Sequence, residues 1–308
     1  MNVMALRRKP DTPRPVNPAL EAFLRGYSIE VMPRTAAKVE DFRTLLPKGT
    51  RVYVAHIDGT PFEDMLATAK RLTREGFDVM PHFPARIIRD RATLAEWIER
   101  YRLEAGVRQA LLLAGGVSRP QGEFADSMQL LETGLFERAG FTRLHVAGHP
   151  EGNRDIDPDG GTDRVMEALR WKQDYARRTS AEMAIVTQFC FEPAPVIAWA
   201  ERLKAEGIEL PIHIGVAGPA KLQTMIKFSI ACGVGASLRV LQRRAKDVTK
   251  LLVPFEPGEF LSALAAHKAD NPDFNVTNVH FFPLGGIKTN ATWAMEHGGS
   301  SARPAADS

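Results

Sequence analysis

Residues 51–82, RVYVAHIDGTPFEDMLATAKRLTREGFDVMPH, contain one complete unit of strand, helix and strand. The β-rich run Arg51–His56 precedes Phe62–Glu75, in which apolar residues recur three and four positions apart, as on an amphipathic helix. Gly76 follows where a helix C-cap is expected, and Asp78–His82 is a second β-rich run. Two strands joined by a helix pair in parallel through a right-handed crossover. This stretch therefore predicts an α/β fold with a parallel sheet.

The same pattern recurs along the whole chain. The runs that we interpret as strands are Tyr27–Met32, Arg51–His56, Asp78–His82, Gln109–Ala114, Arg143–Ala147, Met183–Phe189, Ile212–Val216 and Val276–Phe282. The helical segments between them include Phe62–Glu75, Ala92–Glu104, Asp126–Ala139, Thr162–Thr179 and Pro195–Glu206. Eight such repeats favour a single closed (β/α)8 TIM barrel over an open sheet. No GxGxxG motif of a Rossmann unit follows any of these strands.

We expect the barrel to span residues 21–297 as one catalytic domain. Residues 1–20 and 298–308 are rich in Pro, Ser and Ala, which predicts a mobile N-terminal segment and a disordered tail. The connection between the last two strands is longer than one crossover requires. It is expected to hold about three extra helices, including Pro219–Ala231 and Pro257–Lys268.

The composition excludes several classes of protein. The 308 residues carry a net charge of +3 without a basic stripe, which argues against a nucleic-acid partner. No run of about 18 apolar residues occurs, so no membrane span is expected. Cys190 and Cys232 lie far apart in apolar surroundings, as buried free thiols do in a reducing compartment, and no metal-ligand spacing is present. We therefore expect a soluble, cytoplasmic protein without a bound metal.

Glu30 is an unusual residue for its position, because it lies within an apolar strand. Burying an unpaired carboxylate is costly. Glu30 must therefore have either a cationic partner, such as Arg34, or a raised pKa suited to proton transfer. The sequence leaves both alternatives open.

Other candidate residues lie at strand ends, where (β/α)8 barrels carry their reacting groups. They are His56 and Asp58, His82, Gly115-Gly116, Gly148-His149-Pro150-Glu151, Gln188 and Gly215–Gly218. A strand-end histidine is more often a hydrogen-bonded structural residue than a catalyst. That interpretation is stronger for His145, His213 and His280, which lie within strands. The paired glycines can form a tight turn, or can let the backbone approach a flat ring or a phosphate.

Taken in order, five motifs resemble those of methylenetetrahydrofolate reductase, over nearly the whole chain from Tyr27 to Trp293. They are Ser28-Ile29-Glu30-Val31-Met32-Pro33-Arg34, Pro81-His82, Gly148-His149-Pro150-Glu151-Gly152-Asn153, Thr187-Gln188-Phe189 and Val279-His280-Phe281-Phe282. The resemblance implies an oxidoreductase of one-carbon metabolism and methionine biosynthesis. Such an enzyme interconverts 5,10-methylenetetrahydrofolate and 5-methyltetrahydrofolate with NADH or NADPH, through FAD.

The resemblance also implies roles for individual residues. Glu30 would be the catalytic proton donor to the folate. Gln188 would bind the pterin, and we assign Phe189 and Leu222 to substrate binding with it. The residues assigned to cofactor binding are His56, His82, Ala114, Gly115, Gly116, Gly148, His149, Glu151, Asn153 and Lys172.

The chain departs from the family mainly on the flavin side. Ala114-Gly115-Gly116 replaces the Arg-Gly-Asp whose aspartate lies beside the flavin. The Asp, Asn and Arg of the fifth helix become Val165, Ala168 and Trp171, while Lys172 is kept. Asn153 stands in place of the flavin-side histidine, and Pro283-Leu284-Gly285-Gly286 replaces Thr-Leu-Asn-Arg after the last strand.

Two schemes for hydride delivery follow. In the first, NAD(P)H reduces FAD, which then reduces the folate. In the second, nicotinamide lies beside Gly115-Gly116 and transfers hydride directly to the folate. Two other classes of function stay open, namely a pterin-binding barrel that transfers a methyl group and a folate-binding protein without turnover.

Overall fold

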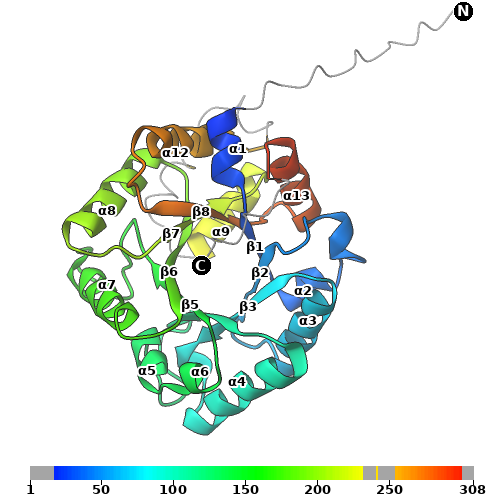
Figure 1. Cartoon of the computed structure of the whole chain (residues 1–308), viewed down its shortest axis with the longest axis vertical. Helices are drawn as coiled ribbons and strands as arrows, with labels where there is room; N and C mark the ends of the chain where they lie inside the picture. The colour runs from blue at the N-terminus through cyan, green and yellow to red at the C-terminus, as the bar shows by residue number, and fades with distance from the viewer. Residues whose placement is uncertain (1–16, 232–240, 242–253, 300–308) are drawn as a thin grey trace, which may run out of the picture.

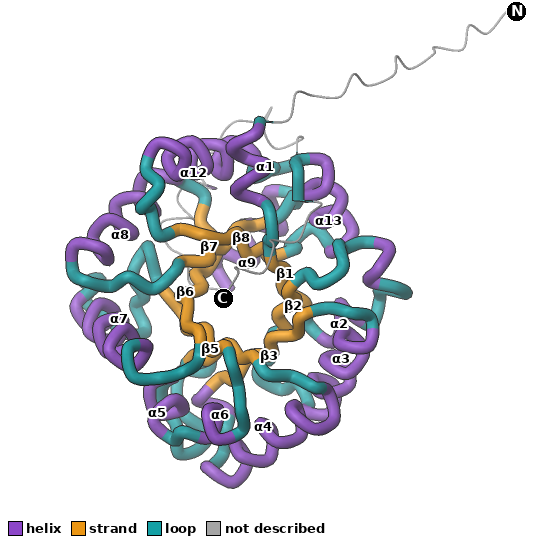
Figure 2. Tube along the Cα trace, in the orientation of Figure 1, coloured by secondary structure: helices purple, strands orange, loops and turns teal. Residues whose placement is uncertain are grey.

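The structure, a computed structural model, describes residues 17–231, 241 and 254–299. Its strands form a closed barrel in the order β1 to β8, and every neighbouring pair is parallel (Figure 1). The helices surround the strands on the outside (Figure 2). The prediction of a (β/α)8 barrel is confirmed.

The strands agree with the predicted runs to within two residues at each end. They are β1 (Ser28–Val31), β2 (Arg51–Val54), β3 (Asp78–Pro84), β4 (Gln109–Leu113), β5 (Arg143–Gly148), β6 (Glu182–Cys190), β7 (Ile212–Ala217) and β8 (Val276–Phe282). The main helices of the outer layer are α3 (Phe62–Arg74), α4 (Arg91–Ala105), α7 (Asp163–Ala176), α8 (Pro193–Ala205), α12 (Gly258–Asp270) and α13 (Ile287–Glu296).

Helix boundaries follow the local capping chemistry. The Asp90 carboxylate accepts a hydrogen bond from the Thr93 N–H at the start of α4, and Gly106 ends that helix with a φ of +66°. The predicted helix Asp126–Ala139 is instead two helices, α5 (Ser127–Glu132) and α6 (Leu135–Arg138). Gly134 separates them because its φ of +62° lies in the left-handed region.

The first helix and the connection between the last two strands differ in detail from the predicted bounds. Helix α1 (Pro18–Leu24) begins inside the segment expected to be mobile, and the Asn17 side chain accepts the N–H groups of its first turn. The rest of that segment and the tail after Gly299 lie outside the described residues. Between β7 and β8, the structure describes two of the expected extra helices, α9 (Leu222–Ala231) and α12, and Cys232 lies outside its described part.

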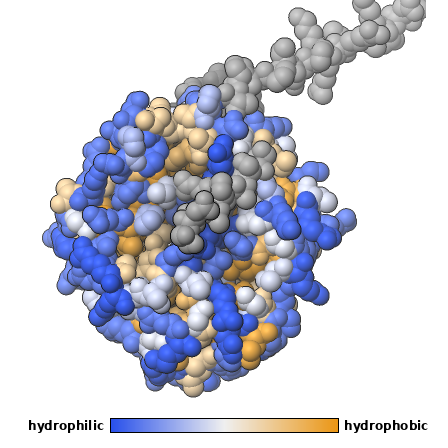
Figure 3. Space-filling view, in the orientation of Figure 1, coloured by the Kyte–Doolittle hydropathy of each residue, from blue (hydrophilic) through white to orange (hydrophobic). Residues whose placement is uncertain are grey.

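Buried side chains recur along the helices of the outer layer with the spacing that places them on one face. Helix α3 buries Met65, Leu66, Ala69 and Leu72 on one face, and each fully buried Leu or Met stabilises the fold by roughly 1.5–3 kcal/mol. The exterior helices present mostly hydrophilic residues to solvent on the face shown in Figure 3. No helix in the described ranges is long and apolar enough to cross a membrane.

The pairing of β6 with β7 is irregular. Its register shifts between Val186 and Phe189, which is a β-bulge, and the Gly215 N–H donates to Thr187 Oγ1 at 2.8 Å. A Cβ atom on Gly215 would lie 2.3 Å from the Thr187 carbonyl oxygen, so only glycine fits there. Bulges redirect side chains, and Gln188 lies within this irregular stretch.

Candidate active site at the carboxyl ends of the strands

Glu30 lies inside the barrel beside two histidines. Its Oε2 atom is 3.2 Å from Nε2 of His82 on β3 and 3.7 Å from Nε2 of His280 on β8. The Glu30 side chain is 19% exposed, whereas the His280 side chain is fully buried. Neither Nε2 atom has a hydrogen-bond partner elsewhere in the described part of the chain. One carboxylate oxygen thus faces both imidazoles.

Strand geometry explains this cluster. Successive side chains of a strand point to opposite faces, so Ile29 and Val31 enter the outer apolar core while Ser28 and Glu30 face the interior. The β1–β8 register pairs Ser28 with His280. We expected His280 to be a structural residue, and the structure brings it beside Glu30.

The charge state of Glu30 differs from one of the two expectations. Burial raises the pKa of its carboxyl group, but the charge of His82 and the N–H groups of His280 and His82 outweigh burial and lower the pKa to about 2. The expectation of a raised Glu30 pKa is therefore wrong for this structure, and the carboxylate has as its partner an imidazole, which is charged only when protonated. The partner is His82 and not Arg34, which is exposed on the short helix α2 (Pro33–Ala36).

The interior below Glu30 is unusually polar for a barrel core. The Tyr53 hydroxyl lies 2.6 Å from His145 Nδ1, and the His145 ring packs edge-on against His213 with centroids 4.7 Å apart. Burial and, next, the neighbouring His213 charge lower the pKa of His145 well below its usual range. Both histidines lie within strands and pack inside the barrel, as expected of structural residues.

Gln188 occupies the bulge of β6. Its side chain is partly buried, and its buried Oε1 atom has no hydrogen-bond partner among the described residues. A buried acceptor without a partner costs roughly 1–3 kcal/mol, so a ligand that donates to it would bind well. The position of Gln188 therefore fits its predicted role.

Phe189 and Leu222 belong to an apolar cluster over the ends of β6, β7 and β8. The cluster consists of Phe189, Phe191, Ala217, Ala220, Leu222, Met225, Leu241 and Phe255, with Phe282 and Leu284 packed against it. Phe189 and Leu222 are 1% and 2% exposed, so they support the wall of the site and present little surface to a ligand. The half-buried Phe282, whose ring lies 4.9 Å from that of His280, is the aromatic residue that joins this cluster to the Glu30 group.

Ala114, Gly115 and Gly116 follow β4 directly, as predicted. Gly115 has a φ of +99°, and a Cβ atom there would lie 3.0 Å from Pro84 Cβ. Nothing lies within 4 Å of the corresponding position on Gly116. Gly115 is therefore required by a turn against β3, while Gly116 is exposed and has no described atom against its Cβ position.

Arg86, which the sequence did not single out, fastens the loops after β3, β4 and β5. Its guanidinium donates to the carbonyl oxygens of Val117 at 2.9 Å and Ala125 at 3.1 Å, and it pairs with Asp155 at 2.6 Å. These loops border the half of the site that we assigned to the cofactor.

Lys172 and His149 form the polar part of that half. The Lys172 ammonium is buried and donates to the Ala147 carbonyl oxygen at 3.2 Å. Burial lowers its pKa to about 8. Burial and, second, the Lys172 charge lower the pKa of His149 to about 4, and Asn153 Nδ2 lies 3.5 Å from His149 Nδ1. The buried ammonium thus has the Ala147 carbonyl oxygen as a hydrogen-bond partner, and the charge of Asp126 acts on it as well.

The remaining predicted cofactor residues have evident packing roles. A Cβ atom on Gly148 would lie 2.2 Å from Ile185 Cγ2, so close packing on β6 requires glycine. His56 Nε2 bonds to its own loop at Thr60 O (3.0 Å), and its ring packs on Trp97. Burial of the Cys190 thiol raises its pKa, and the charge of Glu151 raises it further. Glu151 is therefore near the end of β6. Their roles in cofactor binding stay predictions.

Three α7 residues stand where the resemblance to methylenetetrahydrofolate reductase would place flavin contacts, and their side chains are apolar or aromatic. Val165 is 2% exposed within the apolar core. Trp171 stacks on Tyr175 with centroids 5.4 Å apart, beneath the Arg178 guanidinium. With Ala168, these positions offer no carboxylate, amide or guanidinium to a cofactor. Only Lys172 keeps a charged group there.

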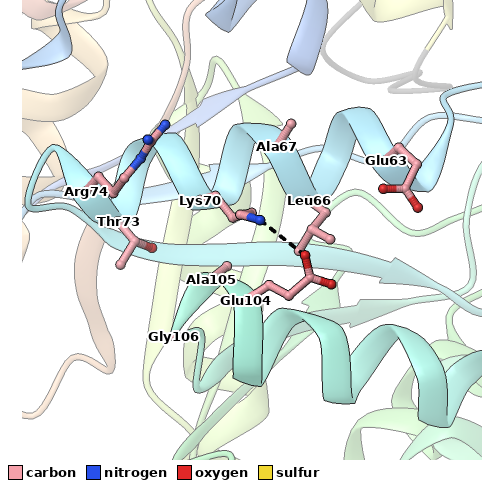
Figure 4. Close-up of a pocket in the computed structure, with 9 residues that line it drawn as sticks. All are labelled: Glu63, Leu66, Ala67, Lys70, Thr73, Arg74, Glu104, Ala105 and Gly106. Atoms are coloured by element: carbon pink, nitrogen blue, oxygen red, sulfur yellow. Dashed lines mark hydrogen bonds and ion pairs between the residues drawn. The ribbon is translucent and has the colours of Figure 1, made fainter.

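Other parts of the described surface offer less chemistry. Within the described ranges, no three His, Cys, Asp or Glu side chains are grouped to hold a metal ion. A groove of about 480 Å³ lies between α3 and α4, crossed by the 3.1 Å ion pair of Lys70 with Glu104 (Figure 4). It is on the outside of the barrel, away from Glu30.

Comparison with known proteins supports the fold. No protein-family model matches the chain. A similar solved structure is that of an uncharacterized protein from Clostridium thermocellum, described as binding two copies of 5-methyl-5,6,7,8-tetrahydrofolic acid. The TM-score is 0.56 at 9% sequence identity, over 91% of this chain and 96% of that chain. At this identity the likeness shows a shared fold.

Proposed function

We propose that this chain interconverts 5,10-methylenetetrahydrofolate and 5-methyltetrahydrofolate, with NADH or NADPH as the hydride donor. The observation that carries the proposal is the cluster of Glu30, His82 and His280 at the end of the barrel that also carries Gln188, whose buried acceptor has no hydrogen-bond partner among the described residues. The 5-methyltetrahydrofolate bound by the similar barrel from Clostridium thermocellum supports a folate as the ligand.

The folate would lie over β6, β7 and β8. The Gln188 amide can both accept from and donate to the edge of a pterin. Beside it, the half-buried Phe282 offers an aromatic face to a flat ring, backed by the apolar cluster around Phe189. This half of the site thus combines one specific polar contact with an apolar wall, as small-molecule sites commonly do.

Glu30 would transfer the proton. A bound folate would exclude water from the 19% of the side chain that is exposed, which disfavours the carboxylate and raises its pKa. When His82 is in its imidazolium form, its proton can then move to Glu30 and on to the bridging nitrogen of methylenetetrahydrofolate, which leaves His82 as the neutral imidazole. Breaking the bond from that nitrogen to the bridging carbon leaves an iminium carbon. Hydride addition to this carbon yields the methyl group, and NAD(P)⁺ is the oxidised product.

The chemistry of the cofactor half favours direct hydride transfer. The α7 positions do not fit a flavin, whereas Gly116 leaves open space and Lys172 can face an anionic group of a nicotinamide dinucleotide. Direct transfer requires the two reacting carbons to lie about 3–3.5 Å apart, with both substrates bound together. An enzyme that used FAD would alternate the two substrates on the flavin.

The decisive experiment is an assay of NADH and NADPH oxidation with methylenetetrahydrofolate, beside an absorbance spectrum of the purified protein. We expect turnover without flavin absorbance and without added FAD. Flavin absorbance that tracks activity would support the first scheme instead. Methyl transfer without nicotinamide dependence would identify a methyltransferase, and folate binding without either reaction would identify a binding protein.

A further inference from the structure

Ser28 and His280 form a buried pair to which the reaction assigns no role. They are register partners on β1 and β8, with residue exposures of 2% and 0%. Ser28 Oγ lies 2.9 Å from His280 Nδ1, while its other potential acceptor, the Val279 carbonyl oxygen, is 3.5 Å away. The hydroxyl can donate to Nδ1 or accept from it, so the position of the ring hydrogen depends on what the other ring nitrogen, Nε2, faces.

The carboxylate that faces Nε2 selects one of the two neutral forms of the imidazole. If Ser28 donates to Nδ1, the ring hydrogen is on Nε2, which faces Glu30 Oε2 at 3.7 Å. The opposite form would place an Nε2 lone pair against a carboxylate oxygen, and the two would repel each other. The hydrogen bond made by one ring nitrogen thus determines what the other presents.

Groups on the neighbouring strands leave this arrangement undisturbed. The Tyr53 ring of β2 lies 4.4 Å from that of His280, but its hydroxyl is bonded to His145 of β5. Arg51 of β2 and His82 of β3 act on His280 through their charges. His213 of β7 packs against His145. Within the described part of the chain, Ser28 is therefore the hydroxyl that faces Nδ1.

We propose that Ser28 is a positioning residue that holds His280 as the Nε2–H form, with this N–H directed at Oε2 of Glu30. Both histidines then engage Oε2, and Oε1 is left as the oxygen that transfers the proton to the substrate. The role of Oε1 rests on the proposed function, whereas the position of the hydrogen on the His280 imidazole does not depend on it.

The test is ¹⁵N NMR of the histidine side chains in the full-length protein, with the His280→Gln variant identifying the His280 signals. We expect the Nε2–H form in the wild-type protein, its retention in Ser28→Thr, which keeps the hydroxyl, and a mixture of forms in Ser28→Ala. A wild-type His280 that carries its hydrogen on Nδ1 would overturn the proposal. This measurement needs only the wild-type protein and the assignment variant, even where Ser28→Ala does not fold.

A second experiment compares the steady-state kinetics of wild type, Ser28→Ala and Ser28→Thr. Ser28→Ala is expected to lower kcat about tenfold, the worth of roughly one hydrogen bond, with a shifted pH profile and a nearly unchanged KM for folate. Ser28→Thr should restore both. An unchanged pH profile in an active Ser28→Ala enzyme would overturn the catalytic part and leave the proposed function intact. If no variant and no wild-type sample turns over folate, the proposed function fails, while the NMR result still decides the form of His280.

Discussion

At the scale of single residues, the proposed reaction would depend most directly on Glu30. Replacing Glu30 by Gln keeps the shape of the side chain but removes the group that carries the proton. Turnover should fall by about 10²–10⁴-fold, the usual contribution of general acid catalysis, with folate affinity largely retained. Steady-state kinetics and folate titration measure the two effects. Glu40→Gln, which changes an exposed carboxylate, is the control, and near-normal turnover in Glu30→Gln would exclude Glu30 from the mechanism.

Gln188 should affect binding instead of chemistry. Gln188→Ala removes the amide that we place on the pterin edge and should weaken folate binding by roughly 1–3 kcal/mol. Because this buried acceptor has no partner among the described residues, its removal should also leave the free energy of unfolding unchanged or higher. Calorimetric titration with 5-methyltetrahydrofolate checks the first effect, and Gln121→Ala, an exposed glutamine, is the control. Equal affinity in wild type and Gln188→Ala would contradict the assignment.

Lys172 should lower stability at neutral pH. Its pKa falls from 10.5 to about 8 on folding, so the folded state disfavours the ammonium. That penalty is fully present below pH 8 and fades as the pH rises towards 10.5. Lys172→Met should therefore raise the free energy of unfolding at pH 7 by roughly 1–3 kcal/mol, and by less at pH 9.5. Nucleotide affinity should fall in the same variant.

Urea denaturation at the two pH values measures this difference. Lys204→Met is the matched control, because Lys204 is 55% exposed and forms an exposed ion pair with Asp273. A Lys172→Met protein that is less stable than wild type at pH 7 would show that the contact with the Ala147 carbonyl oxygen outweighs the cost of burying the charge.

At the scale of elements, Arg86 should govern the order of the loops after β3, β4 and β5. Arg86→Ala removes the bonds to Val117, Ala125 and Asp155, so these loops should exchange their amide hydrogens faster. The nucleotide KM should rise while folate affinity stays close to wild type. Arg89→Ala is the control, since the Arg89 side chain is 79% exposed. Unchanged exchange in residues 114–125 would contradict this role.

The elements also show where local signals suffice. The boundaries of the strands and of the amphipathic helix α3 were predicted to within two residues. The spacing of apolar side chains and the glycine caps can be read from short stretches of sequence. The break at Gly134 was missed, since a glycine within a helical pattern is often tolerated. The bulge at Thr187-Gln188 was also missed, because it arises only when β6 pairs with β7.

At the scale of the whole molecule, closure of the barrel depends on the contact between β6 and β7. Gly215→Ala would place a methyl group 2.3 Å from the Thr187 carbonyl oxygen, and the strands would have to move apart. We expect a loss of roughly 1–3 kcal/mol or more in the free energy of unfolding, together with weaker folate binding as Gln188 moves. Thermal and urea unfolding measure the first effect.

Gly116→Ala is the matched control for that variant. Nothing lies within 4 Å of the added methyl group, so stability should change by less than about 0.5 kcal/mol. Its nucleotide affinity should nevertheless fall if nicotinamide lies against Gly116. If Gly215→Ala is as stable as Gly116→Ala, then β6 and β7 can move apart at little cost, and the expected loss of stability is contradicted.

The sequence by itself determined the eight strands, their parallel order and the positions of Glu30 and Gln188 near strand ends, because all of these follow from local periodicity. Only the tertiary structure decided what surrounds them. Ser28 and His280 are 252 residues apart and meet because the first and last strands close the barrel. The same closure places two imidazoles on one oxygen of Glu30, and their charge and N–H groups overcome the effect of burial on its pKa. No local pattern encodes such a contact, since the energy of a charge depends on neighbours that the fold brings together.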